Sequence, residues 1–561
     1  MSRVLFLLAT GAVVGLGSSC ADNAASGTGL PVGDVESIRV EPAEVVLRPK
    51  SDTPQSVDFT AYATFPGGEE VPIDLVSWSS SNLSAGDIDS DGVFTSVDTN
   101  GGVTEITATH LGITGTASLS VVYTQDVLED GLDAGVADAF RTASPTASDR
   151  PALLYPLDGV RVPRNLEGLV FLWDQPNPGT VQRLAFESDI TDISVYRSGA
   201  DRWFATSDLW ARIAASNRNG RVRVYVEGGQ WDGSTLTNVV RGPELELTVN
   251  RLDARGSVLY WSTTSMGVRR IPLGSAESSS FYGTEDVQGG CIGCHAVNNA
   301  TDQVVVTYDG VNGMFEILDC ASGEPSVQVG RNQDHRVTFT TVSPDGQHLV
   351  AAQGGNLHVY RMSDGQKLQT FDYLLDMTQP DFAPSGDRIA VVRMAWGNTS
   401  DFRFDGGEIV SIPFADGQLG TPEVIVPTDN VHNFYYPAWS PDGEWLAYNR
   451  TVGGAYASPG AEIFLTDKTG SQHIRLDTAN GEGELQNSYT RWGPLPDDDL
   501  LWLAYSSKRN YPADFGSNPQ IWVTAIDTEK AAAGEDPSSA PFWLPGQDPG
   551  ADNHLPQWWD Q

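Results

Sequence analysis

Two cysteines and one histidine lie within five consecutive residues near the middle of the chain, at Cys291, Cys294 and His295. Their spacing is C-x-x-C-H, which is the attachment pattern of c-type haem. Two thiols separated by two residues can both reach the vinyl groups of one porphyrin and form thioethers, and the adjacent neutral imidazole can then bind the iron. The motif therefore predicts one covalent haem c, with His295 as the proximal ligand of its iron.

The same thiols allow two other arrangements. Cys291 and Cys294 could close a redox-active disulfide, although no thioredoxin-like βαβ pattern surrounds them. A zinc site would need a fourth ligand, and Cys320 is the only spare thiol in the sequence. We expect Cys320 to be a small buried apolar residue. Haem attachment is therefore our expectation, and the disulfide and the zinc site are its alternatives.

The elements that must position this motif belong to a repeat in the last 300 residues. Ser343-Pro-Asp-Gly346 recurs as Ser440-Pro-Asp-Gly443, and diverged copies begin at Ala383 and Gly493. A short strand pattern precedes each copy and an apolar strand pattern follows it. A repeat of roughly 40–60 residues that contains several strands is typical of propeller blades.

Residues 255–561 resemble the TolB-like propellers that are built from WD40-like repeats. We count six blades, of which the one at Val258 to Trp261 lacks a first strand. The tail His554-Leu-Pro-Gln-Trp558 resembles such a first strand, and we expect it to complete that blade and close the ring. The resemblance implies a protein-binding propeller, because TolB-like propellers mostly bind proteins.

A second ligand would decide what the haem iron can do. We expect the residues before each first strand to gather with His295 at one mouth of the central channel. By repeat position His335, His432 and Met377 are the candidate distal ligands, and His554 lies nearby. A bound ligand would give a six-coordinate electron carrier, whereas an open iron would bind a small molecule or react with peroxide. The alternative is that these are ordinary polar residues of a channel mouth.

The first twenty residues predict a secretory signal. Arg3 precedes an apolar run from Val4 to Leu16, and small residues then lead to Cys20. This ending resembles a bacterial lipoprotein signal, which implies that Cys20 carries the lipid and that residues 21–35 form a tether. Ala21 rather than Asp after the cysteine implies sorting to the outer membrane. The alternative is an ordinary cleaved signal with an incidental cysteine.

Two β-sandwiches are expected between the tether and the propeller. Residues 36–124 resemble a group 2 bacterial Ig-like domain, on the segments Val40-Glu41-Pro42, Trp78 to Asn82 and Asp91-Gly92-Val93. Residues 125–149 carry few apolar side chains and are expected to be a linker. Residues 150–252 alternate like a fibronectin-III-like sandwich. The expected fold is therefore all-β, with two sandwiches followed by a six-bladed propeller.

Composition narrows the function. The 561 residues contain 34 Lys and Arg against 73 Asp and Glu, which gives a net charge of −39. This charge excludes binding to nucleic acid and docking on an anionic membrane through charge. No Ser-His-Asp order, P-loop or HExxH motif is present. We expect an electron carrier with envelope or extracellular redox partners; the alternatives are a non-enzymatic surface scaffold that binds a protein or glycan, and a haem peroxidase-like enzyme.

Overall fold

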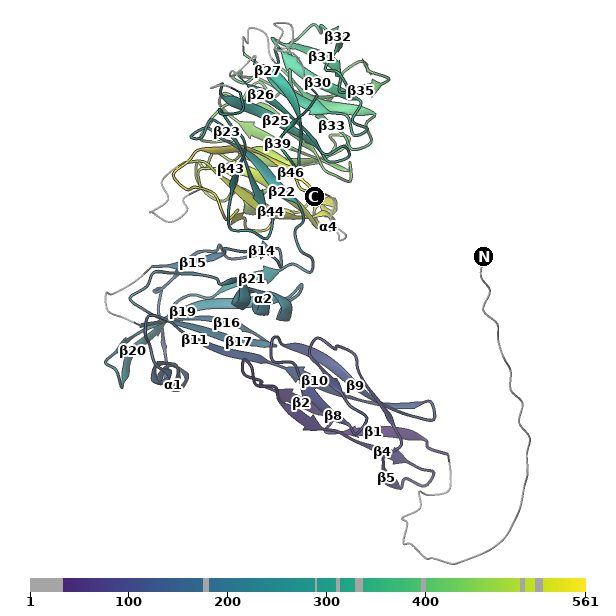
Figure 1. Ribbon diagram of the computed structural model, residues 1–561, viewed down its shortest axis with the longest axis vertical. Coiled ribbons are helices and arrows are strands. Elements are labelled where there is room, and N and C mark those ends of the chain that lie inside the picture. The colour runs from purple at the N-terminus through teal and green to yellow at the C-terminus, as the bar shows by residue number, and fades with distance from the viewer. Residues whose placement is uncertain are drawn as a thin grey trace, which may run out of the picture.

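The computed structural model describes residues 34–174, 181–287, 290–308, 313–327, 336–394, 400–494, 500–509 and 518–561. Cys20 and His335 therefore lie outside the described residues. The expected all-β class is confirmed: strands dominate, and three domains follow one another from the N-terminal sandwich to the propeller (Figure 1). Among the described helices, none has both the length and the apolar character needed to cross a bilayer.

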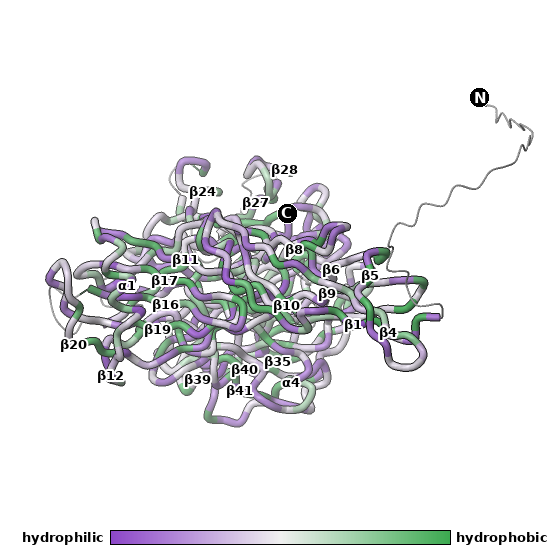
Figure 2. Tube along the Cα trace, turned by 90° about the horizontal axis from the view of Figure 1, so that it is seen from below, coloured by the Kyte–Doolittle hydropathy of each residue, from purple (hydrophilic) through white to green (hydrophobic). Residues whose placement is uncertain are grey.

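The N-terminal domain packs three small sheets around one core. The first sheet has the order β1 (Ser37–Glu41), β4 (Thr60–Thr64), β5 (Glu70–Ile73). The second has the order β2 (Glu44–Leu47), β10 (Ile113–Val121), β9 (Gly102–His110), β6 (Ser77–Ser80). The third has the order β3 (Ser56–Asp58), β8 (Val93–Ser96), β7 (Gly86–Ile88). Every second residue of β9 and β10 is buried, and Figure 2 shows hydrophobic stretches along β10.

The second domain is built on a large mixed sheet. Its path runs β11 (Tyr123–Leu128), β17 (Thr191–Ser198), β16 (Val181–Ser188), β19 (Arg221–Trp231), β20 (Leu236–Arg241), β12 (Thr146–Ala147), and β21 (Leu245–Val249) and β14 (Val160–Val162) join at β19. A smaller sheet has the order β13 (Leu153–Tyr155), β15 (Val170–Trp173), β18 (Arg202–Phe204). The helices are α1 (Ala134–Thr142) and α2 (Ser207–Ser216).

This domain corrects two expectations. Residues 125–149 are not a linker, because β11 pairs in parallel with β17 and α1 buries Val136, Ala137 and Phe140 at helical spacing. The sheet also differs from a fibronectin-III-like sandwich, since three of its strand pairs are parallel and two helices accompany it. Residues 125–149 are mostly polar, so the few apolar side chains that pack in this segment could not be recognised from its composition.

The propeller region contains six antiparallel sheets within the described residues. The first sheet joins β24 (Ser279–Tyr282), β23 (Gly267–Pro272), β22 (Ser257–Ser262), β46 (Asn553–Trp559). The second joins β25 (Ile292–Asn298), β26 (Gln303–Tyr308), β27 (Met314–Asp319), β28 (Pro325–Val327). The third joins β29 (Phe339–Val342), β30 (His348–Gln353), β31 (Asn356–Arg361), β32 (Lys367–Phe371).

The other three sheets follow in chain order. The fourth joins β33 (Met377–Phe382), β34 (Arg388–Arg393), β35 (Glu408–Ala415), β36 (Gln418–Leu419), β37 (Glu423–Val426). The fifth joins β38 (Asn433–Trp439), β39 (Trp445–Thr451), β40 (Glu462–Asp467), β41 (His473–Arg475). The sixth joins β42 (Ser488–Trp492), β43 (Leu500–Ser507), β44 (Gln520–Asp527), β45 (Phe542–Trp543). The short helices α3 (Asp477–Asn480) and α4 (Thr528–Ala533) follow β41 and β44.

The inner strands close a ring. The strands β25, β29, β33, β38, β42 and β46 each contact the next one in this order, and β46 also contacts β25. The C-terminal strand β46 pairs antiparallel with β22, with Trp558 opposite Val258, as the sequence predicts. The first sheet of the propeller therefore joins the two ends of the region and closes the ring.

The repeated Ser-Pro-Asp-Gly segment is a turn that starts the second strand of a sheet. Ser440 Oγ donates to Asp442 Oδ1 at 2.5 Å and accepts the backbone N–H of Trp445 at 2.9 Å. Gly443 has φ 72°, a conformation that favours glycine. The repeat detected in the sequence thus has a structural cause and carries no chemistry of its own.

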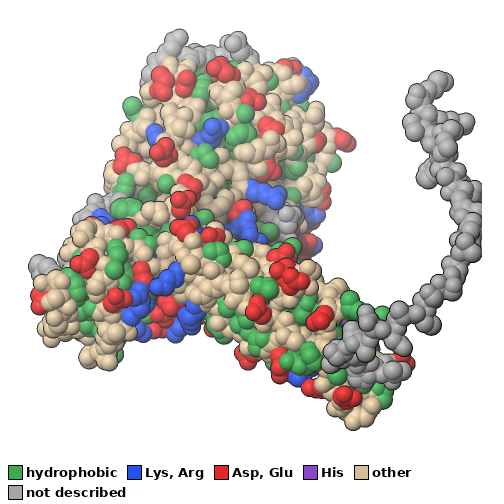
Figure 3. Space-filling model, turned by 60° about the horizontal axis from the view of Figure 1, so that its bottom comes forward, with side chains coloured by type: hydrophobic (Ala, Val, Ile, Leu, Met, Phe, Trp, Pro, Cys, Tyr) green, Lys and Arg blue, Asp and Glu red, His purple; other side chains and the backbone are tan. Residues whose placement is uncertain are grey.

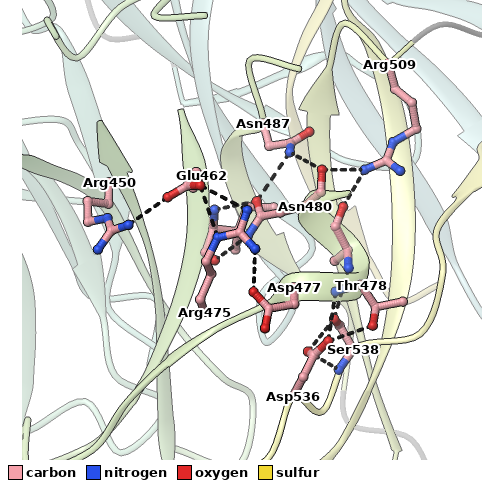
Figure 4. A network of polar contacts seen from close by, with 12 residues as sticks. Arg450, Glu462, Arg475, Asp477, Thr478, Asn480, Asn487, Arg509, Asp536 and Ser538 are labelled. Atoms are coloured by element: carbon pink, nitrogen blue, oxygen red, sulfur yellow. Dashed lines mark hydrogen bonds and ion pairs between the residues drawn. The ribbon is translucent and has the colours of Figure 1, made fainter. Parts of the chain in front are cut away.

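Polar contacts join the fifth sheet to the sixth beside α3 (Figure 4). The N–H and Oγ1 of Thr478 donate to Asp536 Oδ2 at 2.8 and 2.6 Å. On the other side of the helix, Arg509 Nη2 donates to the carbonyl of Asn480 at 3.1 Å. These contacts fix neighbouring sheets at their outer edge, away from the channel.

The second domain and the propeller share a hydrophobic cluster. The Tyr155 ring meets Trp522 edge-on at 6.2 Å, and its hydroxyl accepts the N–H of Trp543 at 3.0 Å. Val160 forms a β-bridge with Ala540. The propeller is therefore attached through a packed interface. Figure 3 shows acidic side chains spread over the visible surface of the molecule, in keeping with its net charge of −39.

Candidate functional site

The C-x-x-C-H motif lies on the inner strand β25, at a β-bulge. Ile292 is opposite Tyr308 and His295 is opposite Val306, so Gly293 and Cys294 together face one residue of β26. A bulge of this kind changes the alternation of side chains between the two faces of a strand. The motif therefore does not follow the simple alternation of a regular strand.

Equivalent positions of the inner strands carry a ring of side chains. These positions lie four residues before the start of each hairpin turn, and they hold Cys294, Phe339, Gln379, Tyr436, Tyr489 and Leu555. Four of them have positive φ: Gln379, Tyr436, Tyr489 and Leu555. Five belong to one apolar cluster although they come from five different sheets. Side chains of five sheets can meet only near the axis, so Cys294 faces the central channel.

Both motif thiols open into one cavity of about 180 Å³ at this ring. Its walls include six aromatic side chains, which are Trp261, Phe339, Phe402, Tyr436, Tyr456 and Tyr489. The Tyr436 ring lies 4.6 Å from Tyr489 and 5.7 Å from Phe339, measured between ring centroids. Cys291 and Cys294 form no disulfide with each other in the structure. Both cysteines of the motif thus line one cavity, whose aromatic walls the motif did not reveal.

Burial controls the ionisation of these groups. It raises the pKa of Cys294 to about 12, against a smaller opposite effect of Arg491, so the thiol is neutral at pH 7. It lowers the pKa of His295 to about 4, so this imidazole is also neutral. A neutral imidazole is the form that binds metal.

His295 does not share the surroundings of the thiols. It takes the strand position that Pro380, Pro437 and Pro556 occupy in other sheets, and it is not among the residues that line the cavity of the thiols. Nε2 is 3.4 Å from the carbonyl of Leu259, and Nδ1 is buried without a hydrogen-bond partner among the described residues. His295 therefore does not line the cavity of the thiols in this structure, and its role as the proximal ligand stays a prediction.

The candidate distal ligands are not brought together. Met377 is buried on β33 in an apolar cluster with Val350 and Ile389. His432 Nδ1 donates to Asp429 Oδ2 at 2.5 Å, and its side chain lines a different cavity of about 890 Å³. His335 lies outside the described residues. The spacing between these residues and the Ser-Pro-Asp-Gly repeat could not reveal that they lie apart. The bulge and the loops before each strand change the direction of the side chains.

His554 comes nearest to the aromatic cavity. Its ring centroid is 5.3 Å from Tyr489 and 6.0 Å from Trp261, and its Nδ1 is 3.1 Å from Ser506 Oγ. Burial lowers its pKa to about 4. Within the described ranges, no three His, Cys, Asp or Glu side chains form a group that could hold a metal ion.

The residues fit a haem c in part. The thiols fit, because both reach one apolar, aromatic-walled cavity, and the orphaned Nδ1 of His295 is a buried nitrogen that lacks a bond. Two features do not fit this conformation. The cavity is smaller than the roughly 300–1,000 Å³ of ordinary ligand pockets, and His295 is not among its lining residues. Ligation by His295 would require the start of β25 to leave its pairing with Tyr308.

No protein-family model matches the chain, and no curated protein matches it either. Solved structures similar to it include the nidogen/laminin complex, with 13% identity over 54% of this chain and 97% of that chain and a TM-score of 0.38. TolB from Acinetobacter baumannii shows 11% identity, coverage of 60% and 79%, and a TM-score of 0.37. A putative TolB from Agrobacterium tumefaciens shows 14% identity, coverage of 54% and 98%, and a TM-score of 0.32.

Proposed function

We propose that the protein is a cell-envelope lipoprotein whose TolB-like, six-bladed propeller carries one haem c on Cys291 and Cys294, and that it transfers single electrons to envelope or extracellular partners. The two N-terminal domains act as spacers between the lipid on Cys20 and the propeller. The observation that supports this function is the pair of motif thiols on one aromatic cavity at the channel. A haem held there would supply reversible one-electron exchange at iron.

The chain's own residues would exclude water and hold the thiols. The cavity walls are almost entirely apolar, and the carbonyl of Cys294 accepts a hydrogen bond from Thr307 Oγ1 at 3.1 Å. Cys291 and Cys294 would each hold the haem through a thioether, and the hydrogen of each thiol would pass to the vinyl group that its sulfur joins. His295 would bind iron only after the bulged end of β25 turns its ring towards the channel, which would also give its buried Nδ1 or Nε2 a bond.

Spectroscopy of the protein produced with a cytochrome c maturation system tests the electron-transfer function. A six-coordinate carrier should give sharp reduced-minus-oxidised bands and should not bind carbon monoxide. His295→Ala should leave both thiols in place and change the spin state of the iron. A wild type that is high-spin and binds carbon monoxide would contradict the electron carrier and would favour a small-molecule or peroxide site.

The anchor is tested separately. Cys20→Ala should abolish lipid labelling and release the protein from the membrane fraction, because the variant lacks the thiol that would carry the lipid. Labelled, membrane-bound protein from this variant would contradict the anchor without bearing on the haem.

A second function, a haem-free binding scaffold, is favoured by one observation on the propeller. Three large apolar side chains, Leu374, Val431 and Val452, are 85%, 61% and 75% exposed. Val431 and Val452 both line the cavity that contains His432. Exposed apolar side chains that gather beside a hollow often mark a binding surface. A protein that carries no haem after co-expression with the maturation system would support this function.

A further inference from the structure

The channel contains a second ring of positions, two residues closer to the hairpin turns than the aromatic ring. It is made of Ala296, Thr341, Asp381, Ala438, Arg491 and Gln557. Thr341 Oγ1 accepts the N–H of Phe382 at 3.1 Å, and Asp381 Oδ2 accepts the N–H of Trp439 at 2.7 Å. Each bond links one inner strand to the next around the axis, so this ring also lies in the channel.

Arg491 is the only basic side chain of this second ring. Its Nη1 donates to the carbonyl of Thr490 at 2.9 Å, and it forms no ion pair with any carboxylate that the structure describes. Its positive charge acts on Cys294 and on Asp381, and lowers the pKa of both. A guanidinium close to an apolar cavity, and without an anionic partner, is a natural receptor for a carboxylate.

The distance between the two rings suits a small ligand. Tyr489 lines the aromatic cavity, and Arg491 lies two residues further along β42. Two residues of an extended strand span at most about 6.6 Å, and the bulge between Ser488 and Arg491 shortens this distance. An aromatic ring in the cavity could therefore place a carboxylate, one or two bonds away, at the guanidinium.

We propose that the channel binds a small organic carboxylate, with its aromatic part against Phe339, Tyr436 and Tyr489 and its carboxylate on Arg491. The aromatic walls supply stacking and edge contacts, and the fork of the guanidinium supplies two parallel hydrogen bonds. This site goes beyond the proposed function, because it needs neither the haem nor the thiols. A haem on Cys291 and Cys294 would fill the same cavity, so the carboxylate site belongs to the haem-free protein.

Asp381 should make the binding depend on pH. Burial raises its pKa to about 6, so it is mostly ionised at pH 8 and mostly neutral at pH 5.5. A ligand carboxylate with a pKa of about 4 stays ionised over this range. The other groups nearby do not titrate there: His295 and His554 have pKa values of about 4, and Cys294 has a pKa of about 12. Arg491 stays charged, so binding should tighten as the pH falls.

Calorimetry with three probes on the haem-free Cys291→Ser/Cys294→Ser variant tests the site. Phenylacetate should bind at least about tenfold more tightly than its neutral isostere phenylacetamide, and acetate, which lacks the ring, should bind most weakly. Arg491→Gln should abolish the preference for the anion, and Arg491→Lys should retain part of it. Arg361→Gln, at an exposed arginine on β31, is the matched control and should leave all three affinities unchanged.

The outcomes are distinct. Equal affinities for phenylacetate and phenylacetamide, or an unchanged preference in a folded Arg491→Gln protein, would overturn the proposal. If Arg491→Gln does not fold, Arg491→Lys and the pH series decide it. Phenylacetate affinity should rise about threefold or more from pH 8 to 5.5 in the parent variant and stay flat in Asp381→Asn. Because the test protein has no thiols at the motif, a negative result would say nothing against haem attachment.

Discussion

At the scale of single residues, spacing in the sequence identified the thiols but not the direction of the imidazole. Cys291 and Cys294 were expected on one site, and the structure places both on one cavity. Cys320 is buried, as expected of a small apolar residue. His295 follows Cys294 directly, and the bulge of β25 directs the two side chains to different surroundings. Such a bulge depends on pairing with β26, which a motif of five residues cannot show.

The aromatic cavity could also be predicted only in part from the sequence. Tyr436 and Tyr489 occupy one repeat position, and this signal was available in the aligned repeats. Trp261, Phe402 and Tyr456 come from strand ends and loops outside that position, so their convergence on the channel follows only from the closed ring.

The buried carboxyl of Asp381 should destabilise the protein at neutral and alkaline pH. Its pKa is raised to about 6 in the folded chain, above the ordinary 3.8, so ionisation is harder in the folded than in the unfolded state. Asp381→Asn should therefore raise the free energy of unfolding at pH 8 by about 1–2 kcal/mol. The gain should fade as the pH falls from 6 to 4, where the folded carboxyl is already protonated.

Urea unfolding of both proteins at pH 8 and pH 4 measures this difference. Asp372→Asn is a suitable control, because Asp372 is exposed on the same propeller region. An Asp381→Asn protein that is less stable than wild type at pH 8 would show that the carboxylate is stabilised in the channel.

At the scale of elements, the local turn chemistry was the reliable signal. The strands around Ser343-Pro-Asp-Gly346 and Ser440-Pro-Asp-Gly443 form where the repeats predict them, because Gly with positive φ and the Ser-Asp hydrogen bonds fix the hairpin locally. The second domain was less predictable. Its parallel pairs join segments far apart in sequence, such as β11 with β17, and alternation within one strand carries no information on its partner.

The C-terminal strand β46 should be needed for the stability of the whole ring. It supplies the partner of β22 and contributes Leu555 to the channel cluster. Deleting residues 553–561 would expose β22 and open the ring, so the propeller should melt at a markedly lower temperature or fail to fold cooperatively.

Calorimetric scanning of this deletion and of a chain that lacks residues 36–121 provides the comparison. The second deletion removes a domain with its own core and should affect the propeller transition much less. Equal losses in the two proteins would contradict ring closure by β46 as the stabilising contact.

At the scale of the whole molecule, a packed interface joins the second domain and the propeller into one unit. The cluster that joins them includes Tyr155, Trp522 and Trp543. A propeller separated from residues 1–252 would expose this surface to water. We therefore expect the isolated propeller to be less soluble than the full chain, and the two parts to unfold together.

Tyr155 offers a direct test of this coupling. Its hydroxyl accepts the buried N–H of Trp543, so Tyr155→Phe leaves that N–H without a partner and should cost about 1–3 kcal/mol of unfolding free energy. Tyr373→Phe, which removes a hydrogen bond to the carbonyl of Gly420 on the propeller rim, should cost less. If Tyr155→Phe left stability unchanged while the domains melted separately, the rigid connection would be wrong.

The central claim is that Cys291 and Cys294 attach one haem. Intact-mass spectrometry of the denatured protein, produced with a cytochrome c maturation system, measures this most directly, because thioethers survive denaturation and a loosely held haem does not. Wild type and Cys320→Ala should both carry the added mass of one haem, and Cys291→Ala/Cys294→Ala should carry none. A wild-type mass equal to that of the bare polypeptide, or lower only by the two hydrogens of a Cys291–Cys294 disulfide, would contradict the account.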